Sequence, residues 1–508
     1  MPDNTPVSLS HRGRLGFLLK DSLLYGGAGA VSKAFALITF PLLARHFSVT
    51  DYGVLDYFLV LSTFLAIAFT FGQDSGVARY FYEHEDTAER RQLISQSLLF
   101  QLAGLALLLP LLWWSAGWVT GFLIEAPKSE RLFRIVLLKL PFLLLISFSR
   151  NLLKWTFARA RFLTMSLGAT LVHVSLLLVA VLLVDVGIEG VLLVSLFTDV
   201  VFGLLGLLFV RQWLTHPRDF HRLCEMLPFA IPYGVICVLG AFSPALQRSL
   251  TDHLLGSESL GLYAMGTKIA MLIGLVVTAF QTAWGPFSLS LHKQADAPHT
   301  YNRVLKLFAL GMCMVVFGLS LVARPIIHVL ASDRYAGAGV VVFPLAMGLA
   351  IQATSWITEI GIGIAKRSYL KLYAYALNVA ATLAGIFLLA SVFGLFGVAL
   401  GVVIGHTVKA VILSWLAQRA YPLPWPYAPV AGVLGLTLAF GIVAAWLGEH
   451  WGPNANTAVL VVGLLTVLVV GWSVLLSESE RRGAAALIKM RVARFTGNLR
   501  ESHPPTNR

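Results

Sequence analysis

Apolar runs of about 20 residues alternate with short polar connections from residue 22 almost to the end of the chain. A helix rises 1.5 Å per residue, so about 20 residues cross a hydrocarbon core of about 30 Å. We therefore predict an all-α polytopic membrane protein with about fourteen transmembrane helices. The predicted spans are residues 22–44, 54–77, 93–114, 132–153, 163–184, 188–210, 227–249, 259–283, 304–330, 338–364, 370–391, 396–417, 427–447 and 457–476.

Composition excludes a soluble protein. Of the 508 residues, 57% are hydrophobic and only 12% are charged, and the mean hydropathy is +0.78. Soluble domains carry about a quarter charged residues. The net charge of +13 would favour nucleic-acid binding in a soluble protein. Here the basic residues follow the predicted loops, so no nucleic-acid partner is expected.

The distribution of Lys and Arg predicts the orientation of the chain. Connections on the side of the N-terminus carry 25 of these residues, whereas those on the opposite side carry 3. Because basic loops are retained in the cytoplasm, both termini are predicted to be cytoplasmic. The first 20 residues are polar and basic, without a signal-peptide core, so the first span itself is expected to direct the chain to the membrane.

The chain contains an internal repeat. At a shift of about 207 residues, Ala158–Phe162 matches Ala365–Tyr369 and Gly187–Val191 matches Gly394–Val398, while Gly53 matches a glycine 208 positions later. Six spans per copy is an even number, so both copies cross the membrane in the same direction. The copies should be related by a pseudo-two-fold axis along the membrane normal.

The repeat predicts four parts. They are an N-terminal six-helix lobe at 1–215, a C-terminal six-helix lobe at 216–420, two additional transmembrane helices at 421–476 and a basic cytoplasmic tail at 477–508. The tail mixes basic and apolar residues, which favours contact with anionic membrane lipids.

Ionisable residues lie within or at the ends of the spans that begin the two halves. An ion at such depth costs about 3 kcal/mol, so it normally faces a wet cavity or a partner. We predict a central cavity in which cations exceed acids, a balance that favours an anionic substrate such as a pyrophosphate. Its predicted substrate-binding residues are Lys33, Arg79, Arg248, Lys268, Asp56, Asp74 and Asp252.

Other interpretations of the intramembrane charges remain open. Arg79 and Arg248 lie near span ends, where a long side chain can snorkel to the interface. Glu359 is a candidate for ion coupling, by carrying a proton or binding sodium. The alternative for Glu359 is an ion pair with Lys409 or Arg150. His173 and Asp199, in adjacent spans, are expected to bond each other.

Several short motifs resemble those of a known family. In the first half they are Leu43–Phe47, Asp51–Gly53 and Ser75–Phe81, and in the second half Leu227–His253 and Gly261–Tyr263. These segments resemble the polysaccharide biosynthesis proteins, the Wzx-type oligosaccharide flippases of the multidrug/oligosaccharidyl-lipid/polysaccharide exporter superfamily. The resemblance covers about residues 17–420.

The resemblance implies two six-helix bundles around a central cavity that alternates between inward-open and outward-open states. It implies a substrate linked to undecaprenyl pyrophosphate, a coupling ion that is H⁺ or Na⁺, a bacterial inner-membrane location and polysaccharide assembly proteins as partners. The lipid II flippase branch of the same superfamily, in which fourteen spans also occur, is an alternative.

Two further classes were weighed. A membrane glycosyltransferase or polymerase would show a large outward loop, yet the longest predicted one has about 17 residues, and the chain has neither an Asp-x-Asp nor a His-Glu-x-x-His motif. A drug antiporter would favour an acidic cavity. Three separated cysteines form no metal-binding spacing. We therefore predict a transporter that is not an enzyme and has no cofactor and no metal.

Overall fold

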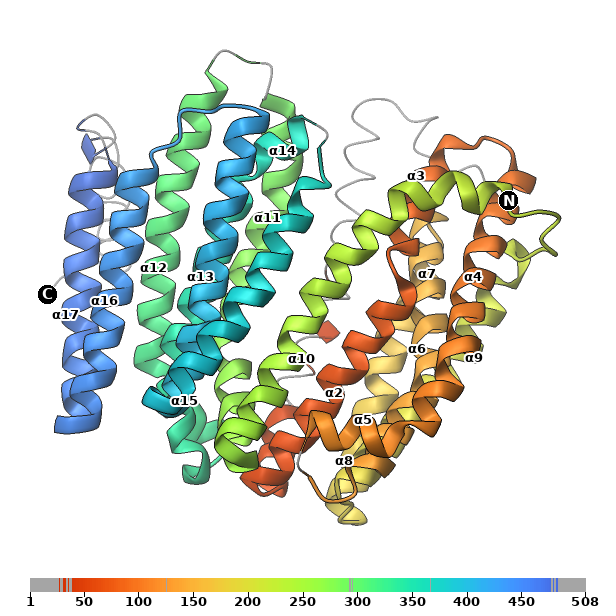
Figure 1. Ribbon diagram of the computed structural model, residues 1–508, viewed down its shortest axis with the longest axis horizontal. Helices are drawn as coiled ribbons and strands as arrows, with labels where there is room; N and C mark the ends of the chain where they lie inside the picture. The colour runs from red at the N-terminus through yellow and green to blue at the C-terminus, as the bar shows by residue number, and fades with distance from the viewer. Residues whose placement is uncertain are drawn as a thin grey trace, which may run out of the picture. The chain divides into compact units, whose positions relative to one another are not determined.

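The computed structural model describes residues 27, 31, 32, 35, 39–124, 126–291, 294, 296–365, 367–476, 478, 481 and 482. Within these residues the regular structure is entirely helical, which confirms the predicted fold class (Figure 1). The α-helices are α2 Val49–Thr70, α3 Gln73–Glu83, α4 Thr87–Trp114, α5 Ala116–Leu123, α6 Ser129–Trp155, α7 Arg159–Leu163, α8 Ala169–Leu183, α9 Ile188–Val210, α10 His221–Ala270, α11 Ile273–Leu291, α12 Ala297–Leu330, α13 Gly339–Thr358, α14 Ile360–Ile364, α15 Leu370–Ala420, α16 Tyr427–Trp451 and α17 Pro453–Leu475; the short turns are η2 Thr164–Gly168, η3 Arg211–Trp213 and η4 Asp333–Ala338.

Eleven helical segments in the described part of the chain are long and apolar enough to cross a membrane. The protein is thus a multi-pass membrane protein. Two of these segments, α10 and α15, have 50 and 51 residues and contain a glycine with non-helical dihedrals, Gly256 and Gly394. Each corresponds to two predicted spans. Most of the predicted span 22–44, including Lys33, lies outside the described residues, and the number of fourteen crossings stays a prediction.

Glycines make α15 a tight helical hairpin. Gly394 has φ of 54°, a left-handed conformation that glycine adopts at little cost. On either side of it the two arms approach closely, because a Cβ at Gly401 would lie 2.5 Å from the Ile386 nitrogen and one at Gly397 would meet the Leu389 carbonyl. Small residues at successive turns allow such backbone contact between membrane helices.

The contacts between residues divide the chain into two compact units. The first contains 1–269, 324–341 and 368–408, and the second contains 270–323, 342–367 and 409–508. In the second unit, the C-terminal pair α16 and α17 lie side by side (Figure 1). Gly441 of α16 faces the Phe343 ring of α13, and Gly471 of α17 faces Leu310 of α12. The division into six-helix lobes at 215 and 420 stays a prediction.

The α2–α3 boundary interrupts one predicted span. Ser48 caps the N-terminus of α2 by accepting a hydrogen bond from the Asp51 backbone N–H. At the other end Phe71 and Gly72 have φ of 44° and 73°, which stops α2 and starts α3. The predicted span 54–77 is therefore two helices, with Gln73 and Asp74 in the first turn of the second.

Helix α2 and its junction with α3 pack closely against the two arms of α10 within the first unit. A Cβ at Gly53 would lie 2.5 Å from the Gly261 nitrogen, and a Cβ at Gly72 would lie 2.5 Å from the Gly234 nitrogen. Gly53 and Gly261 are also residues that the internal repeat pairs. A contact between matched residues is what a two-fold axis near this point produces.

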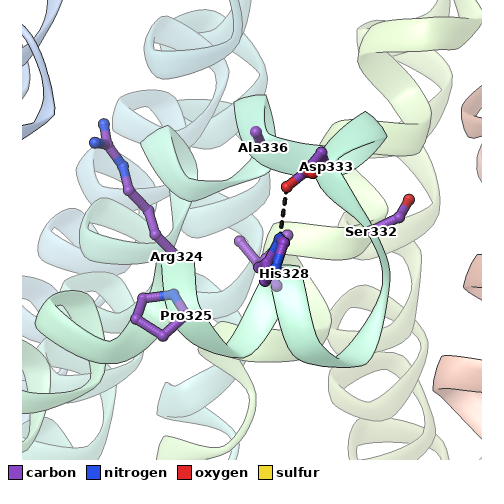
Figure 2. A pocket seen from close by; sticks show the side chains of 7 residues that line it. Arg324, Pro325, His328, Ser332, Asp333 and Ala336 are labelled. Atoms are coloured by element: carbon purple, nitrogen blue, oxygen red, sulfur yellow. Dashed lines mark hydrogen bonds and ion pairs between the residues drawn. The ribbon is translucent and has the colours of Figure 1, made fainter.

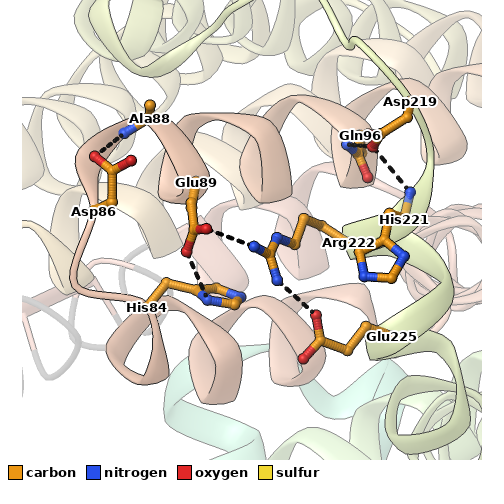
Figure 3. Close-up of polar contacts among 9 residues, drawn as sticks. All are labelled: His84, Asp86, Ala88, Glu89, Gln96, Asp219, His221, Arg222 and Glu225. Carbon is orange, nitrogen blue, oxygen red and sulfur yellow. Dashed lines mark hydrogen bonds and ion pairs between the residues drawn. The ribbon is translucent and has the colours of Figure 1, made fainter.

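A polar cluster fastens the chain entering α10 to the beginning of α4 (Figure 3). The Arg222 guanidinium lies 2.6 Å from Glu89 and 3.1 Å from Glu225, and Glu89 also lies 3.3 Å from the His84 ring. Nearby, the buried Gln96 side chain accepts a 2.9 Å hydrogen bond from the Leu223 backbone N–H. The segment connecting the two predicted halves is therefore held to the first half.

Candidate substrate-binding site

A polar cavity of about 610 Å³ lies in the first unit. One wall is a single face of α6, because Lys139, Leu143, Ile146, Ser147, Arg150, Asn151 and Lys154 follow the helical spacing i, i+4, i+7, i+8, i+11, i+12 and i+15. The three cations therefore form a row along one side of this helix. From Lys139 to Lys154 the row extends about 22 Å at 1.5 Å per residue.

The opposite wall comes from α2 and the first turn of α3. Leu59, Ser62, Thr63, Ala66, Ile67 and Thr70 line it from one face of α2, and Asp74 lines it from the first turn of α3. Ser62, Thr63 and Thr70 supply hydroxyl groups. The Thr63 and Thr70 hydroxyls donate to the carbonyls of Leu59 and Ala66, so their oxygen lone pairs remain available as acceptors.

Helix α9 closes the cavity through Ser195 and Asp199. Lys139 is almost fully buried, and its Nζ lies 3.6 Å from Asp199 Oδ2. This oxygen is itself buried and has no hydrogen-bond partner within the described residues. The pair is thus an ion pair longer than a hydrogen bond, with capacity for a further donor.

The charges lining the cavity sum to a positive balance, with three cations against the carboxylates of Asp74 and Asp199. Lys139 is paired with Asp199. Arg150 and Lys154 form no ion pair within the described residues, although Arg150 lies 3.5 Å from the Ser166 hydroxyl. The Arg150 guanidinium and the Lys154 ammonium lie one helical turn apart. This arrangement suits an anion with several oxygens, such as a phosphate or diphosphate.

A second group of charges in the same unit is formed by ion pairs around the buried Asp56. Arg248 Nε lies 2.7 Å from Asp56 Oδ2, and Lys268 Nζ lies 3.0 Å from Asp56 Oδ1. We call these three residues the buried triad. The side chains of Arg248 and Asp56 are 2% and 1% exposed, whereas that of Lys268 is 38% exposed. Asp56 thus joins α2 to both arms of α10.

The remaining predicted site residues are dispersed. Asp252 accepts a 2.6 Å hydrogen bond from Ser257 across the break at Gly256, so it supports the turn of α10. Arg79 is exposed, lies 3.4 Å from Glu83 in the same helix and stacks over Phe229 at 4.6 Å. Glu359 is at the N-terminus of α14 in the second unit. Lys33 lies outside the described residues.

The structure therefore brings three predicted residues together as the buried triad and places only Asp74 in the cavity. Their roles in binding stay predictions. The expected pair between His173 and Asp199 is wrong, because Asp199 is bound by Lys139 instead. Lys139, Arg150 and Lys154 were not among the residues predicted for the site. Their shared helical spacing, which runs along the predicted span 132–153 and one residue beyond it, was the signal that could have found them.

A smaller hollow lies where α12 meets η4 (Figure 2). It has a volume of about 440 Å³ and is lined by Arg324, His328, Ser332 and Asp333 among others. His328 Nδ1 lies 2.6 Å from Asp333 Oδ1, and both side chains are largely exposed. Exposed pairs of this kind contribute little to stability. Among the described residues, no group of three His, Cys, Asp or Glu side chains could hold a metal ion.

Known proteins similar to this chain include proteins of polysaccharide biosynthesis and transport. The model of a family described as polysaccharide biosynthesis protein matches residues 18–292, more than half of the chain. The succinoglycan biosynthesis transport protein ExoT of Rhizobium meliloti is 24% identical over 486 residues, which cover 90% of this chain and 92% of that protein. An uncharacterized membrane protein of Haemophilus influenzae is 23% identical over 285 residues, 55% of this chain and 67% of that protein.

Solved structures show the same fold at low sequence identity. The lipid II flippase MurJ in an inward closed conformation aligns with a TM-score of 0.68 and 14% identity, over 89% of this chain and 99% of that chain. An inward-facing multidrug resistance transporter of the MATE family, within the MOP superfamily, aligns with a TM-score of 0.63 and 15% identity, over 76% of this chain and 94% of that chain.

Proposed function

Because this chain belongs to the polysaccharide biosynthesis protein family, we propose that it is a flippase for a polyprenyl-pyrophosphate-linked oligosaccharide. In this proposal it moves the precursor across the bacterial inner membrane by alternating access and performs no chemistry on it. ExoT, which aligns with nearly the whole of this chain, is named a succinoglycan biosynthesis transport protein. MurJ, which shares the fold, is named a lipid II flippase.

The observation that carries the proposal is the row of three cations on α6 facing hydroxyl groups on α2 in a cavity of about 610 Å³. Binding sites for small ligands have volumes of about 300–1,000 Å³. The cavity therefore accommodates a diphosphate headgroup with its first sugars rather than a whole polysaccharide. Arg150 and Lys154 would neutralise the diphosphate, while the hydroxyls of Ser62, Thr63 and Ser147 offer hydrogen bonds.

The membrane supplies the physical reason for this arrangement. A diphosphate carries about two negative charges, and moving ions through hydrocarbon is strongly unfavourable. Fixed cations inside a helical bundle replace part of the water that the headgroup gives up. The polyprenyl chain needs no such site because hydrocarbon already solvates it. A protein that shields only the headgroup can therefore lower the barrier to flipping.

Export measured in cells tests the proposal. We expect the double variant Arg150→Gln/Lys154→Gln to reach the membrane at the normal level. Cells that carry it should accumulate lipid-linked precursor on the inner leaflet, and their polymer output should fall at least tenfold. Arg91→Gln, which removes an exposed cation at the start of α4, is the matched control and should export normally. Normal export by the double variant would contradict the proposal.

A further inference from the structure

A much smaller hollow adjoins the cavity. Its volume is about 10 Å³, which is room for one oxygen atom of the size of a water molecule. It lies between α2, α3, α4 and α6, and its polar lining residues are Thr70, Gln73, Asp74, Ser97, Gln101, Ser147 and Asn151. Four of these, Thr70, Asp74, Ser147 and Asn151, also line the cavity. A single group that projects from a ligand in the cavity can therefore reach the hollow.

The hollow contains a buried hydrogen-bond donor that lacks an acceptor. The Gln73 side chain is 0% exposed, and its neighbours set the direction of its amide. The Ser97 hydroxyl accepts a 3.3 Å hydrogen bond from Gln101 Nε2 and gives its own hydrogen to Gln73 Oε1 at 3.0 Å. Gln73 Nε2, with two hydrogens, is then left without a partner within the described residues. Since buried donors are almost always satisfied, an acceptor atom is expected in the hollow.

The carboxylate of Asp74 limits the kind of acceptor that fits beside Gln73. Asp74 follows Gln73 in the first turn of α3, lines the same hollow and accepts a hydrogen bond from the Ser75 backbone N–H. A carboxylate repels the charged oxygens of a phosphate and needs a donor instead. A hydroxyl group suits both neighbours, because its oxygen accepts from Gln73 and its hydrogen is donated to Asp74.

The hollow lies close to the cations of the cavity along α6. Ser147 and Asn151 line the hollow, and Arg150 and Lys154 each follow one of them by three residues. The segment 147–154 extends about 10 Å at 1.5 Å per residue. A sugar bonded to a diphosphate that rests on the two cations would therefore place its hydroxyl groups within reach of the hollow.

We propose that the hollow is a subsite for one hydroxyl group of the sugar bonded to the diphosphate, with Gln73 Nε2 as the donor and the Asp74 carboxylate as the acceptor. This inference rests on the proposed function and adds a residue that selects the headgroup. A diphosphate lipid without a sugar leaves the hollow to water, whereas the sugar hydroxyl replaces that water. A site built to bond a hydroxyl group discriminates against a ligand that lacks it.

Binding to the purified full-length protein tests the subsite. Farnesyl diphosphate is compared with three probes in which the same diphosphate carries glucose, galactose or N-acetylglucosamine. We expect the wild type to bind at least one sugar probe at least tenfold more tightly than farnesyl diphosphate. Gln73→Leu should abolish this preference for the sugar. It should bind farnesyl diphosphate as the wild type does, because Gln73 does not line the cavity that contains the cations.

Gln247→Leu is the matched control. Gln247 is also a buried glutamine of the first unit, but both ends of its amide are bonded, to Ser243 and to Tyr263. This variant should keep the preference for the sugar. Asp74→Asn is a second variant in case Gln73→Leu does not fold. It should lower the sugar preference at least threefold and bind farnesyl diphosphate at least as tightly as the wild type, because the cavity loses a negative charge.

The outcomes separate the subsite from the proposed function. Equal affinity of the wild type for farnesyl diphosphate and all three sugar probes would overturn the subsite, since the hollow would then hold only water. A sugar preference that persists in Gln73→Leu would also overturn it. An equal loss of affinity for all four probes in Gln73→Leu would limit Gln73 to a structural role and overturn its assignment. Failure of the wild type to bind farnesyl diphosphate would contradict the proposed function instead.

Discussion

The buried triad and the cavity hold similar side chains in the same unit and differ in how these are satisfied. In the triad, one carboxylate contacts two cations at 2.7 and 3.0 Å, and the arginine is 2% exposed. In the cavity, three cations line an open space of about 610 Å³, and within the described part of the chain only Lys139 has a carboxylate partner, at 3.6 Å. Charged side chains inside membrane helices are therefore satisfied in two different ways. In the triad they pair with one another and join helices, whereas Arg150 and Lys154 in the cavity form no ion pair among the described residues.

The largest expected effect is on the stability that the triad provides. Asp56→Asn should lower the free energy of unfolding by about 3–5 kcal/mol, because it leaves the buried Arg248 without its counter-charge. The thermal transition of the purified protein measures the change. Asp56→Leu combined with Arg248→Met should recover much of the loss, since neither residue then buries a charge. A transition temperature unchanged in Asp56→Asn would show that the triad does not stabilise the fold.

The second prediction concerns Lys139, the cavity cation that pairs with Asp199. Lys139→Met should destabilise the protein by about 1–3 kcal/mol, because Asp199 keeps a buried charge without compensation. Lys139→Met combined with Asp199→Asn should restore the thermal transition but not export, because the cation is still missing. Restored export in the double variant would limit Lys139 to a structural role.

The third prediction concerns the packing that brings α2 to α10. Gly53→Ala should cost about 1–3 kcal/mol, because the added methyl would lie 2.5 Å from the Gly261 nitrogen and force the helices apart. Gly104→Ala in α4 is the matched control, since no atom lies within 4 Å of its added methyl. That control should be neutral or slightly stabilising, as alanine favours helix over glycine. Both effects are measured as shifts in the thermal transition, and equal shifts would contradict the close contact.

The smallest expected effect is at Arg79. Its ion pair with Glu83 joins two exposed residues on one helix, so Arg79→Ala should change stability by less than about 1 kcal/mol. Export should remain within about twofold of the wild type. A loss of export comparable to that of the Arg150 and Lys154 variants would restore Arg79 as the substrate-binding residue that the sequence predicts.

Most of the helical architecture could be predicted because it follows from one-dimensional patterns. Apolar runs predicted the spans, and Gly256 and Gly394, where the backbone leaves the helical conformation, fall in the predicted connections 250–258 and 392–395. The sequence placed Asp56, Arg248 and Lys268 in one group of intramembrane charges, but it predicted an open cavity and not their direct ion pairs. The break of α2 at Phe71 was not predicted, because the span 54–77 was taken as one apolar run although Gly72, Gln73 and Asp74 follow Phe71 directly.

The cavity could not be predicted because its walls come from helices that are distant in sequence. Lys139, Arg150 and Lys154 share a face of α6, but the sequence alone does not show whether that face meets lipid, another helix or a space. The sequence also does not show which carboxylates lie beside cations and which border a space. Asp56 and Asp74 are similar in sequence terms, yet one is enclosed by cations and the other borders two hollows.

Binding of a polyprenyl diphosphate to the purified protein tests the central claim most directly. Farnesyl diphosphate and farnesol would be titrated against the wild type, Arg150→Gln/Lys154→Gln and the control Arg91→Gln. We predict that the wild type and the control bind the diphosphate in a salt-dependent manner and bind farnesol weakly. We predict that the double variant binds the diphosphate at least tenfold more weakly than the wild type, while its affinity for farnesol and its thermal transition are unchanged. Equal affinity of the double variant and the wild type for the diphosphate would contradict the account.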